Sequence, residues 1–201
     1  MLLLVHSVMN RITTATSYMI TVIIELIKVI SQELYDKILE NLDTTKITCC
    51  CGTIGDFIEY GHYQRTVKSV KETFTLNVQR LKCRACGATH AVLPGTIVPY
   101  QQHSADAQLI ILQYRLGATE LEQLMTDNPE ITESDVLRIR DRYKKHWEQR
   151  LNTMGMKLHN AISDLILSSF AWFNRQFLQI RRGVICKYRP PTSDEYTEDS
   201  M

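Results

Sequence analysis

The chain has 201 residues, of which 44% are hydrophobic and 22% are charged, and this is ordinary for a globular protein. The length allows one moderate domain or two small ones. A net charge of +1 would argue against nucleic acid if it were evenly spread, but it is not. Lys and Arg outnumber Asp and Glu by six to three over residues 49–103 and by six to two over residues 136–150, whereas residues 189–201 carry four acids and one Arg. Such local patches decide how an anion is attracted.

The amino end is apolar but predicts neither a membrane span nor an export signal. Met1–Val5 is short and no small-residue cleavage motif follows it. Charged residues between Arg11 and Lys28 interrupt the roughly 18 apolar residues that a span needs. We therefore expect a cytoplasmic protein that does not enter a membrane. Residues 1–18 are interpreted as a possible upstream extension, poorly ordered or helical, because Met19 is a plausible start.

A strand and a helix are predicted next, at the start of a unit that spans residues 19–103. Ile20–Val29 is rich in β-branched residues, which favour strands. Ser31 is a good N-cap for a helix that continues to about Leu42.

Two cysteine clusters dominate this unit. A Cys-x-Cys-Gly motif occupies residues 49–52 and a Cys-x-x-Cys-Gly motif occupies residues 83–87. Between them, Phe57–Lys68 and Thr73–Lys82 are predicted strands, and the second alternates polar and apolar residues. Two glycine-backed Cys pairs at the ends of a β-hairpin are typical of a zinc ribbon, with one structural Zn²⁺ per chain held by four thiolates. The predicted ligands are Cys49, Cys51, Cys83 and Cys86.

Several alternatives to this ligand set stay open. Cys50 could replace Cys49, because the first pair is one residue shorter than the usual Cys-x-x-Cys. His62 or His90 could enter the metal shell, or the cysteines could simply be reduced and buried. Disulfides are not expected in an intracellular chain.

Basic and aromatic side chains interleave on the predicted ribbon. Tyrosines of the first strand lie among Arg65, Arg80, Lys82 and Arg84, a mixture that suits stacking on bases and contact with phosphates. The same residues would also fit a small sheet whose tyrosines only shield the metal.

Residues 104–155 predict three helices. Ser104 caps Ala105–Leu116, Thr119–Thr126 forms a short second helix, and Glu133–Leu151 forms a longer third helix. Thr132 and Asp135 match a capping box at the start of the third helix. A short middle helix and a basic third helix favour a helix-turn-helix.

The third predicted helix is amphipathic. Its apolar stripe is opposite three basic residues, which we predict to contact duplex DNA together with the ribbon cations. These three residues are Arg138, Arg142 and Lys145.

The carboxyl end predicts one long helix and a tail. Residues 156–183 carry an apolar stripe along a helix about 40 Å long, which exceeds what the small core can cover. Residues 156–182 are therefore a candidate surface for a protein partner or a second copy of the chain. Residues 184–201 are acidic and expected to be disordered.

The motifs CxCG, GHYxR and RxKCxxCGxTHAxLP, followed by VPY, resemble those of short, uncharacterised bacterial proteins of transposase-like type. Residues that carry the resemblance include Cys49, Cys51, His62, Tyr63, Arg65, Arg80, Cys83, Cys86, His90, Leu93, Pro94, Pro99 and Tyr100. The ribbon is also similar to the amino-terminal zinc-binding head of insertion-sequence transposases. This resemblance implies metal-dependent DNA recognition.

The pattern departs from a complete transposase because the chain after the ribbon reads as helical, without strands to carry three carboxylates for paired Mg²⁺ ions. We therefore expect an α+β protein, composed of a zinc ribbon, a helix-turn-helix-like bundle and a long carboxyl-terminal helix. The predicted function is non-catalytic DNA binding. The alternative is a protein-interaction module in which the ribbon is purely structural.

Overall fold

The computed structural model describes residues 12–16, 19–22, 31–70, 72–114 and 118–180. These residues form a mixed α+β fold, as predicted, with one five-stranded sheet and helices that pack on it. The strands are β1 (Ile12–Thr16), β2 (Met19–Val22), β3 (Phe57–Lys68), β4 (Thr73–Cys83) and β5 (Thr89–Pro94). The helices are α2 (Gln32–Glu40), the 3-10 turn η1 (Thr44–Lys46), α3 (Ala105–Gln113), α4 (Ala118–Asp127), α5 (Glu133–His146), α6 (Glu148–Thr153) and α7 (Ile162–Phe173).

The sheet has the strand order β1-β2-β5-β4-β3, in which only β2 and β5 run parallel. The predicted hairpin is confirmed: β3 has the expected bounds, and β4 extends one residue further, to Cys83. Phe57 pairs with Cys83, so the open end of the hairpin reaches the second cysteine motif. The register shifts between Glu59 and His62, which marks a bulge on β3.

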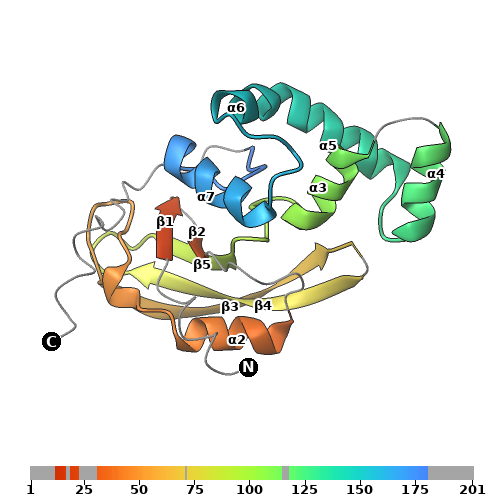
Figure 1. Cartoon of the computed structure of the whole chain (residues 1–201). Coiled ribbons are helices and arrows are strands. Elements are labelled where there is room, and N and C mark those ends of the chain that lie inside the picture. Colours follow the sequence, from red (N-terminus) through yellow and green to blue (C-terminus); the bar gives the residue numbers. More distant parts are fainter. Residues whose placement is uncertain (1–11, 17–18, 23–30, 71, 115–117, 181–201) are drawn as a thin grey trace, which may run out of the picture.

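Helix α2 covers one face of the sheet, while α3, α5, α6 and α7 lie on the other side (Figure 1). The predicted cap is confirmed, because the Ser31 hydroxyl accepts a hydrogen bond from the Leu34 N–H at 3.2 Å. Tyr35 is fully buried beneath the sheet, where its hydroxyl donates to the Val92 carbonyl and accepts from the Gln79 N–H, both at 2.9 Å. One phenol thus joins β5 to β4.

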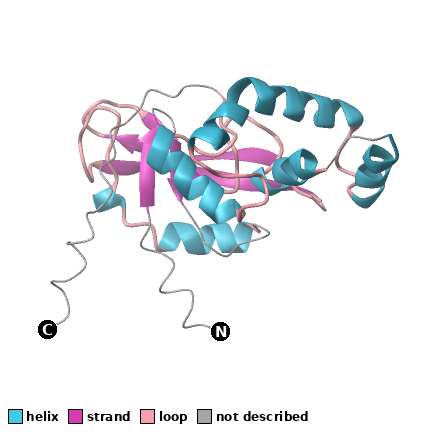
Figure 2. Cartoon of the chain, turned by 45° about the horizontal axis from the view of Figure 1, so that its top comes forward, coloured by secondary structure: helices cyan, strands magenta, loops and turns pink. Residues whose placement is uncertain are grey.

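The helical layer packs around Trp147, which is 1% exposed. Its ring meets Phe177 edge-on at 5.4 Å, and its indole N–H donates to the Gln179 carbonyl at 3.0 Å. Leu151 and Leu165 complete the same cluster from α6 and α7. The turned view shows α7 lying across the strands (Figure 2). This core therefore joins α5, α6, α7 and the segment that follows α7.

A second helical core joins α3, α4 and α5. It consists of buried Ile111, Leu124, Ile131, Val136 and Ile139. Figures 1 and 2 both place α4 at one end of the molecule, beyond the turn of the β3–β4 hairpin. The capping box at the start of α5 is confirmed.

Arg140 attaches α5 to the end of α3. Its guanidinium donates to the carbonyls of Ile111 (3.0 Å) and Tyr114, at the end of α3. Burial lowers the pKa of Arg140.

The predicted long carboxyl-terminal helix is wrong. Helix α7 ends at Phe173, because Asn174 adopts a left-handed conformation with φ of 50°. The chain then returns to the sheet, where the Gln176 amide donates to the carbonyls of Gly95 (2.6 Å) and Ile97 (2.9 Å). Phe177, expected on a helical stripe, is instead fully buried.

Three further predictions need correction. The predicted third helix divides into α5 and α6, because Trp147 leaves helical geometry with φ of −125°. Strand β5 (Thr89–Pro94) was not predicted from the sequence. Ile12–Thr16, expected to be disordered or helical, forms edge strand β1 antiparallel to β2. The remainder of the predicted 20–29 strand beyond β2 and the acidic tail 184–201 lie outside the described residues.

Among the described residues, none of the helices has both the length and the apolar character needed to cross a bilayer.

Candidate metal centre and nucleic-acid interface

The two cysteine motifs form matching backbone turns. The Cys49 N–H donates to the Thr53 carbonyl at 2.8 Å, and the Cys83 N–H donates to the Ala88 carbonyl at 2.9 Å. Each turn passes through a glycine of positive φ, 90° at Gly52 and 74° at Gly87, a conformation that other residues rarely adopt. The first motif has one residue fewer between its cysteines than the second, so its turn is one residue shorter but keeps the same kind of hydrogen bond and glycine.

The predicted ligands Cys49, Cys51, Cys83 and Cys86 come together, with their sulfur atoms all within 4.8 Å of one another. The Cys49–Cys86 sulfur distance is 3.5 Å and the Cys51–Cys83 distance is 3.8 Å. Four thiolates about 2.3 Å from a tetrahedral ion would be about 3.8 Å apart. This quartet could therefore hold a metal ion.

Burial divides the quartet into two kinds of thiol. Cys49 and Cys83 are buried, and burial raises the pKa of each. Cys51 is exposed, and its hydrogen bonds with Thr53 lower its pKa to about 6.

Cys50 and His90 form a second cluster with Cys49. The Cys50 sulfur is 3.7 Å from that of Cys49, and His90 Nε2 is 3.3 Å from the same atom. Cys49 therefore belongs to both candidate ligand sets. His62 is exposed on β3 and lies in no cluster of potential ligands within the described residues.

Two of the four predicted ribbon cations lie beside Tyr60, which is 47% exposed. Arg80 and Lys82 lie over its ring, with charged groups 5.4 and 5.0 Å from the centroid. Arg84 is exposed and only 3.9 Å from the Asp56 carboxylate. Three of the four predicted ribbon cations therefore lie at the metal end of the hairpin.

Arg65 is separate from these residues. It is half-buried and its guanidinium donates to the carbonyls of Val98 (2.7 Å) and Gln101 (2.9 Å). These bonds hold the loop after β5 against the hairpin, a structural role that the sequence did not reveal.

The predicted basic face of α5 is only partly free. Lys145 is exposed and pairs with Asp141 at 2.9 Å, one turn away. Arg142 is half-buried, and burial lowers its pKa. Arg138 is partly exposed and its guanidinium forms an ion pair with Asp135.

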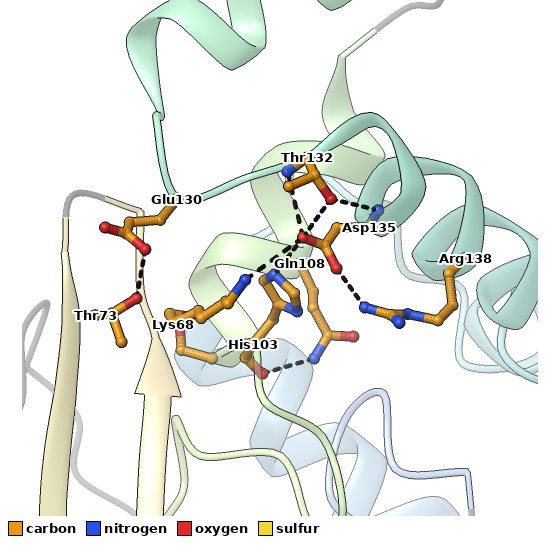
Figure 3. A network of polar contacts seen from close by, with 9 residues as sticks. Lys68, Thr73, His103, Gln108, Glu130, Thr132, Asp135 and Arg138 are labelled. Carbon is orange, nitrogen blue, oxygen red and sulfur yellow. Dashed lines mark hydrogen bonds and ion pairs between the residues drawn. The ribbon is translucent and has the colours of Figure 1, made fainter.

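Asp135 is the centre of a polar junction, which we define as Lys68, His103, Thr132, Asp135 and Arg138 (Figure 3). Its buried carboxylate accepts from the Thr132 hydroxyl at 2.8 Å and lies 3.8 Å from Lys68 Nζ and 3.4 Å from His103 Nε2. Burial raises the pKa of Asp135, but the Thr132 hydrogen bonds and nearby charges outweigh it and the pKa is lowered.

The polar junction joins the turn end of the hairpin to the start of α5. Lys68 ends β3, and a hydrogen bond of 2.6 Å from the Thr73 hydroxyl to the Glu130 carboxylate lies beside it. Sequence reasoning found only the capping box in this region. The long-range partners could not be found, because Lys68 and His103 carry no local pattern that links them to α5.

Residues 48–132 match a family described as a domain of unknown function (DUF6431). The match begins beside the first cysteine motif and ends at the N-cap of α5. No curated protein and no solved structure gives a significant match to the chain.

Proposed function

We propose that the chain is a non-catalytic, zinc-stabilised DNA-binding protein, in which the β3–β4 hairpin is a zinc ribbon and α3–α5 form a helix-turn-helix. The observation that carries the proposal is the shared core of α3, α4 and α5, together with the exposed basic residues Arg138 and Lys145 of α5. The resemblance to the zinc-binding heads of transposases supports the same function and stays a prediction.

Zinc suits the cysteine quartet because Zn²⁺ favours four thiolates in a tetrahedron. Four thiolates fill that shell, so no position is left for a reactive water, and we assign the ion a structural role. Metal analysis of the purified chain should give one zinc per molecule. Cys83→Ser should lose the ion and unfold the hairpin, because a small metal-bound sheet depends on the ion for stability. Cys50→Ser is the matched control and should keep the metal.

The DNA-binding proposal depends on α5. Its buried residues Val136 and Ile139 pack against α3 and α4, while Lys145 is exposed and Arg142 is half-buried at the edge of the packed side. A helix held by its apolar side and basic on its outer side can enter a major groove and contact phosphates. Arg138 shares this side but also belongs to the polar junction, so its replacement would mix a loss of binding with a loss of stability.

The test is the salt dependence of binding to a random-sequence duplex. The slope of log affinity against log salt is about −0.9 per neutralised phosphate, so Arg142→Ala with Lys145→Ala should reduce it by about two. The charge-matched control is Lys37→Ala with Lys46→Ala, on α2 and the 3-10 turn η1. Helix α2 lies on the face of the sheet opposite α5 (Figure 1). An unchanged slope in the first double variant would contradict the role of α5.

A second candidate function is protein interaction, favoured by Trp172. This side chain on α7 is 60% exposed, although tryptophan is usually well buried. Aromatic anchors of this kind are enriched in protein interfaces, and the surface would suit a partner or a second copy of the chain. If this surface binds a partner, Trp172→Ala should abolish partner binding or self-association and leave the salt dependence of DNA binding unchanged. The DNA-binding proposal predicts that Trp172→Ala changes neither the affinity for DNA nor its salt dependence.

A further inference from the structure

His90 is aimed at one sulfur of the candidate metal centre. Its side chain is fully buried on β5, with Nε2 at 3.3 Å from the sulfur of Cys49. The imidazole ring packs edge-on against Phe57, with centroids 5.6 Å apart. Its backbone pairs with Leu81 across the β4–β5 ladder, so both the ring and its strand are fixed. Because the His90 ring is held in one orientation, its contact with the Cys49 sulfur has a defined geometry.

The cysteine quartet needs hydrogen-bond donors on its buried side. Four thiolates around a divalent ion carry a net charge of about −2, and buried charge is costly unless donors reach it. Cys51 and Cys86 are exposed residues, so water can reach that side of the quartet. Cys83 receives backbone hydrogen bonds within its own turn. Cys49 is buried and receives a backbone hydrogen bond from Cys51 within its own turn. His90 is the side chain from outside the cysteine motifs that contacts the Cys49 sulfur.

We propose that His90 is a positioning residue of the metal centre, which donates its Nε2–H to the Cys49 thiolate and so makes Cys49, rather than Cys50, the fourth ligand. This inference rests on the proposed metal centre. Residues that orient metal ligands through hydrogen bonds typically change metal affinity by about 10- to 100-fold when they are removed. The half-buried Cys50 belongs to the same cluster, with its sulfur 3.7 Å from that of Cys49, but the 3.3 Å contact of His90 Nε2 is made with the Cys49 sulfur.

A donor must be distinguished from a ligand. A nitrogen and a sulfur bound to the same tetrahedral zinc ion would be about 3.5 Å apart, which is close to the observed 3.3 Å. The quartet already supplies four sulfurs, so a donor role leaves the ion four-coordinate with sulfur alone. The identity of the atoms bound to the ion therefore decides the question.

The experiment uses the full chain and two replacements of His90. His90→Phe keeps a flat ring against Phe57 but has no donor, whereas His90→Gln keeps an N–H donor. Zinc affinity is measured by competition with a chromophoric chelator. We expect His90→Phe to bind about 10- to 100-fold more weakly and His90→Gln to stay within a few-fold of the parent. The absorption of the Co²⁺-loaded parent and both variants should be that of four sulfur ligands.

A measurement on the parent protein makes the test independent of whether the variants fold. In the ¹¹³Cd-loaded chain, scalar coupling should connect the metal to Hε2 of His90 through the Cys49 sulfur. Direct coupling of ¹¹³Cd to Nε2, or a Co²⁺ spectrum of three sulfurs and one nitrogen, would make His90 a ligand and overturn the proposal. Equal zinc affinity of His90→Phe and the parent would also overturn it. A parent that binds no metal would instead remove the proposed metal centre, and this inference with it.

Discussion

Replacing Asp135 by Ala tests whether the polar junction fixes α5 to the hairpin. The carboxylate is buried and has Thr132, Lys68, His103 and Arg138 as partners. Breaking a buried ion pair costs about 3–5 kcal/mol. The side chains of Lys68 and Arg138 are 29% and 45% exposed, so water can solvate them after the replacement. We therefore expect Asp135→Ala to lower the free energy of unfolding by about 3 kcal/mol, which includes the loss of the helix cap.

The assay is urea and thermal unfolding followed by circular dichroism. For a chain of this size, about 3 kcal/mol corresponds to a fall in Tm of about 6–12 °C. Asp141→Ala is the matched control, since that carboxylate is 57% exposed and has one exposed partner, and it should cost less than about 0.5 kcal/mol. If Asp135→Ala costs no more than Asp141→Ala, the polar junction does not stabilise the fold and the reasoning is refuted.

The same carboxylate predicts a pH dependence. The pKa of Asp135 is lowered in the folded chain, so its contribution to the free energy of unfolding is present above the unfolded pKa of about 3.9 and is lost as pH falls through the lower folded value. The difference in stability between the parent and Asp135→Ala should be complete near pH 6 and narrow below about pH 4. A difference that stays constant down to pH 2 would contradict a charged Asp135 in the fold.

Three further results are expected. Burial, aided by nearby cations, lowers the pKa of His103 in the folded chain, so the unfolded chain takes up this proton first and the free energy of unfolding falls as pH drops below about 6.5. In urea unfolding, His103→Gln should reduce this dependence of stability on pH. The same pH dependence in the variant and the parent would contradict the lowered pKa. Phe177→Ala should lower the free energy of unfolding in urea by about 3–5 kcal/mol, because the ring is fully buried. Trp172→Ala, at an exposed position, should change it by no more than about 0.5 kcal/mol. Similar values for the two variants would be inconsistent with this packing. Deleting residues 1–18 removes β1 and should lower Tm without loss of metal, because β2 keeps its ladder with β5; loss of metal would show that β1 supports the centre.

The hairpin and the cysteine quartet could be predicted because their signals are local. Polar and apolar residues alternate along β4, and glycine follows each cysteine pair. The capping box at Thr132 is equally local and was confirmed. Each cysteine pair, the strand pattern and the cap involve residues a few positions apart, and the hairpin then brings the two cysteine pairs together.

The features that sequence reasoning missed depend on distant partners. The spacing of Phe173 and Phe177 fits a helix, but hydrogen bonds from Gln176 to the loop after β5 hold this segment in another conformation. Strand β5 lacks alternation because almost all of its side chains are buried, as is typical of a strand with a parallel neighbour. Arg65 and Arg140 look like surface cations in sequence, yet both donate to backbone carbonyls.

The parallel pairing of β2 with β5 has a consequence for the order in which the sheet assembles. The β3–β4 hairpin joins neighbouring segments, whereas Ile20 must find Val92 after the intervening chain has been placed. Pairs that close long loops form more slowly, because the lost chain entropy is recovered only once the contact is made. We therefore expect backbone amides of β3 and β4 to become protected from hydrogen exchange early in refolding, and those that join β2 to β5 to become protected late. During synthesis, β2 can pair with β1, but its other edge would wait for β5 to leave the ribosome and would be exposed to other chains until then.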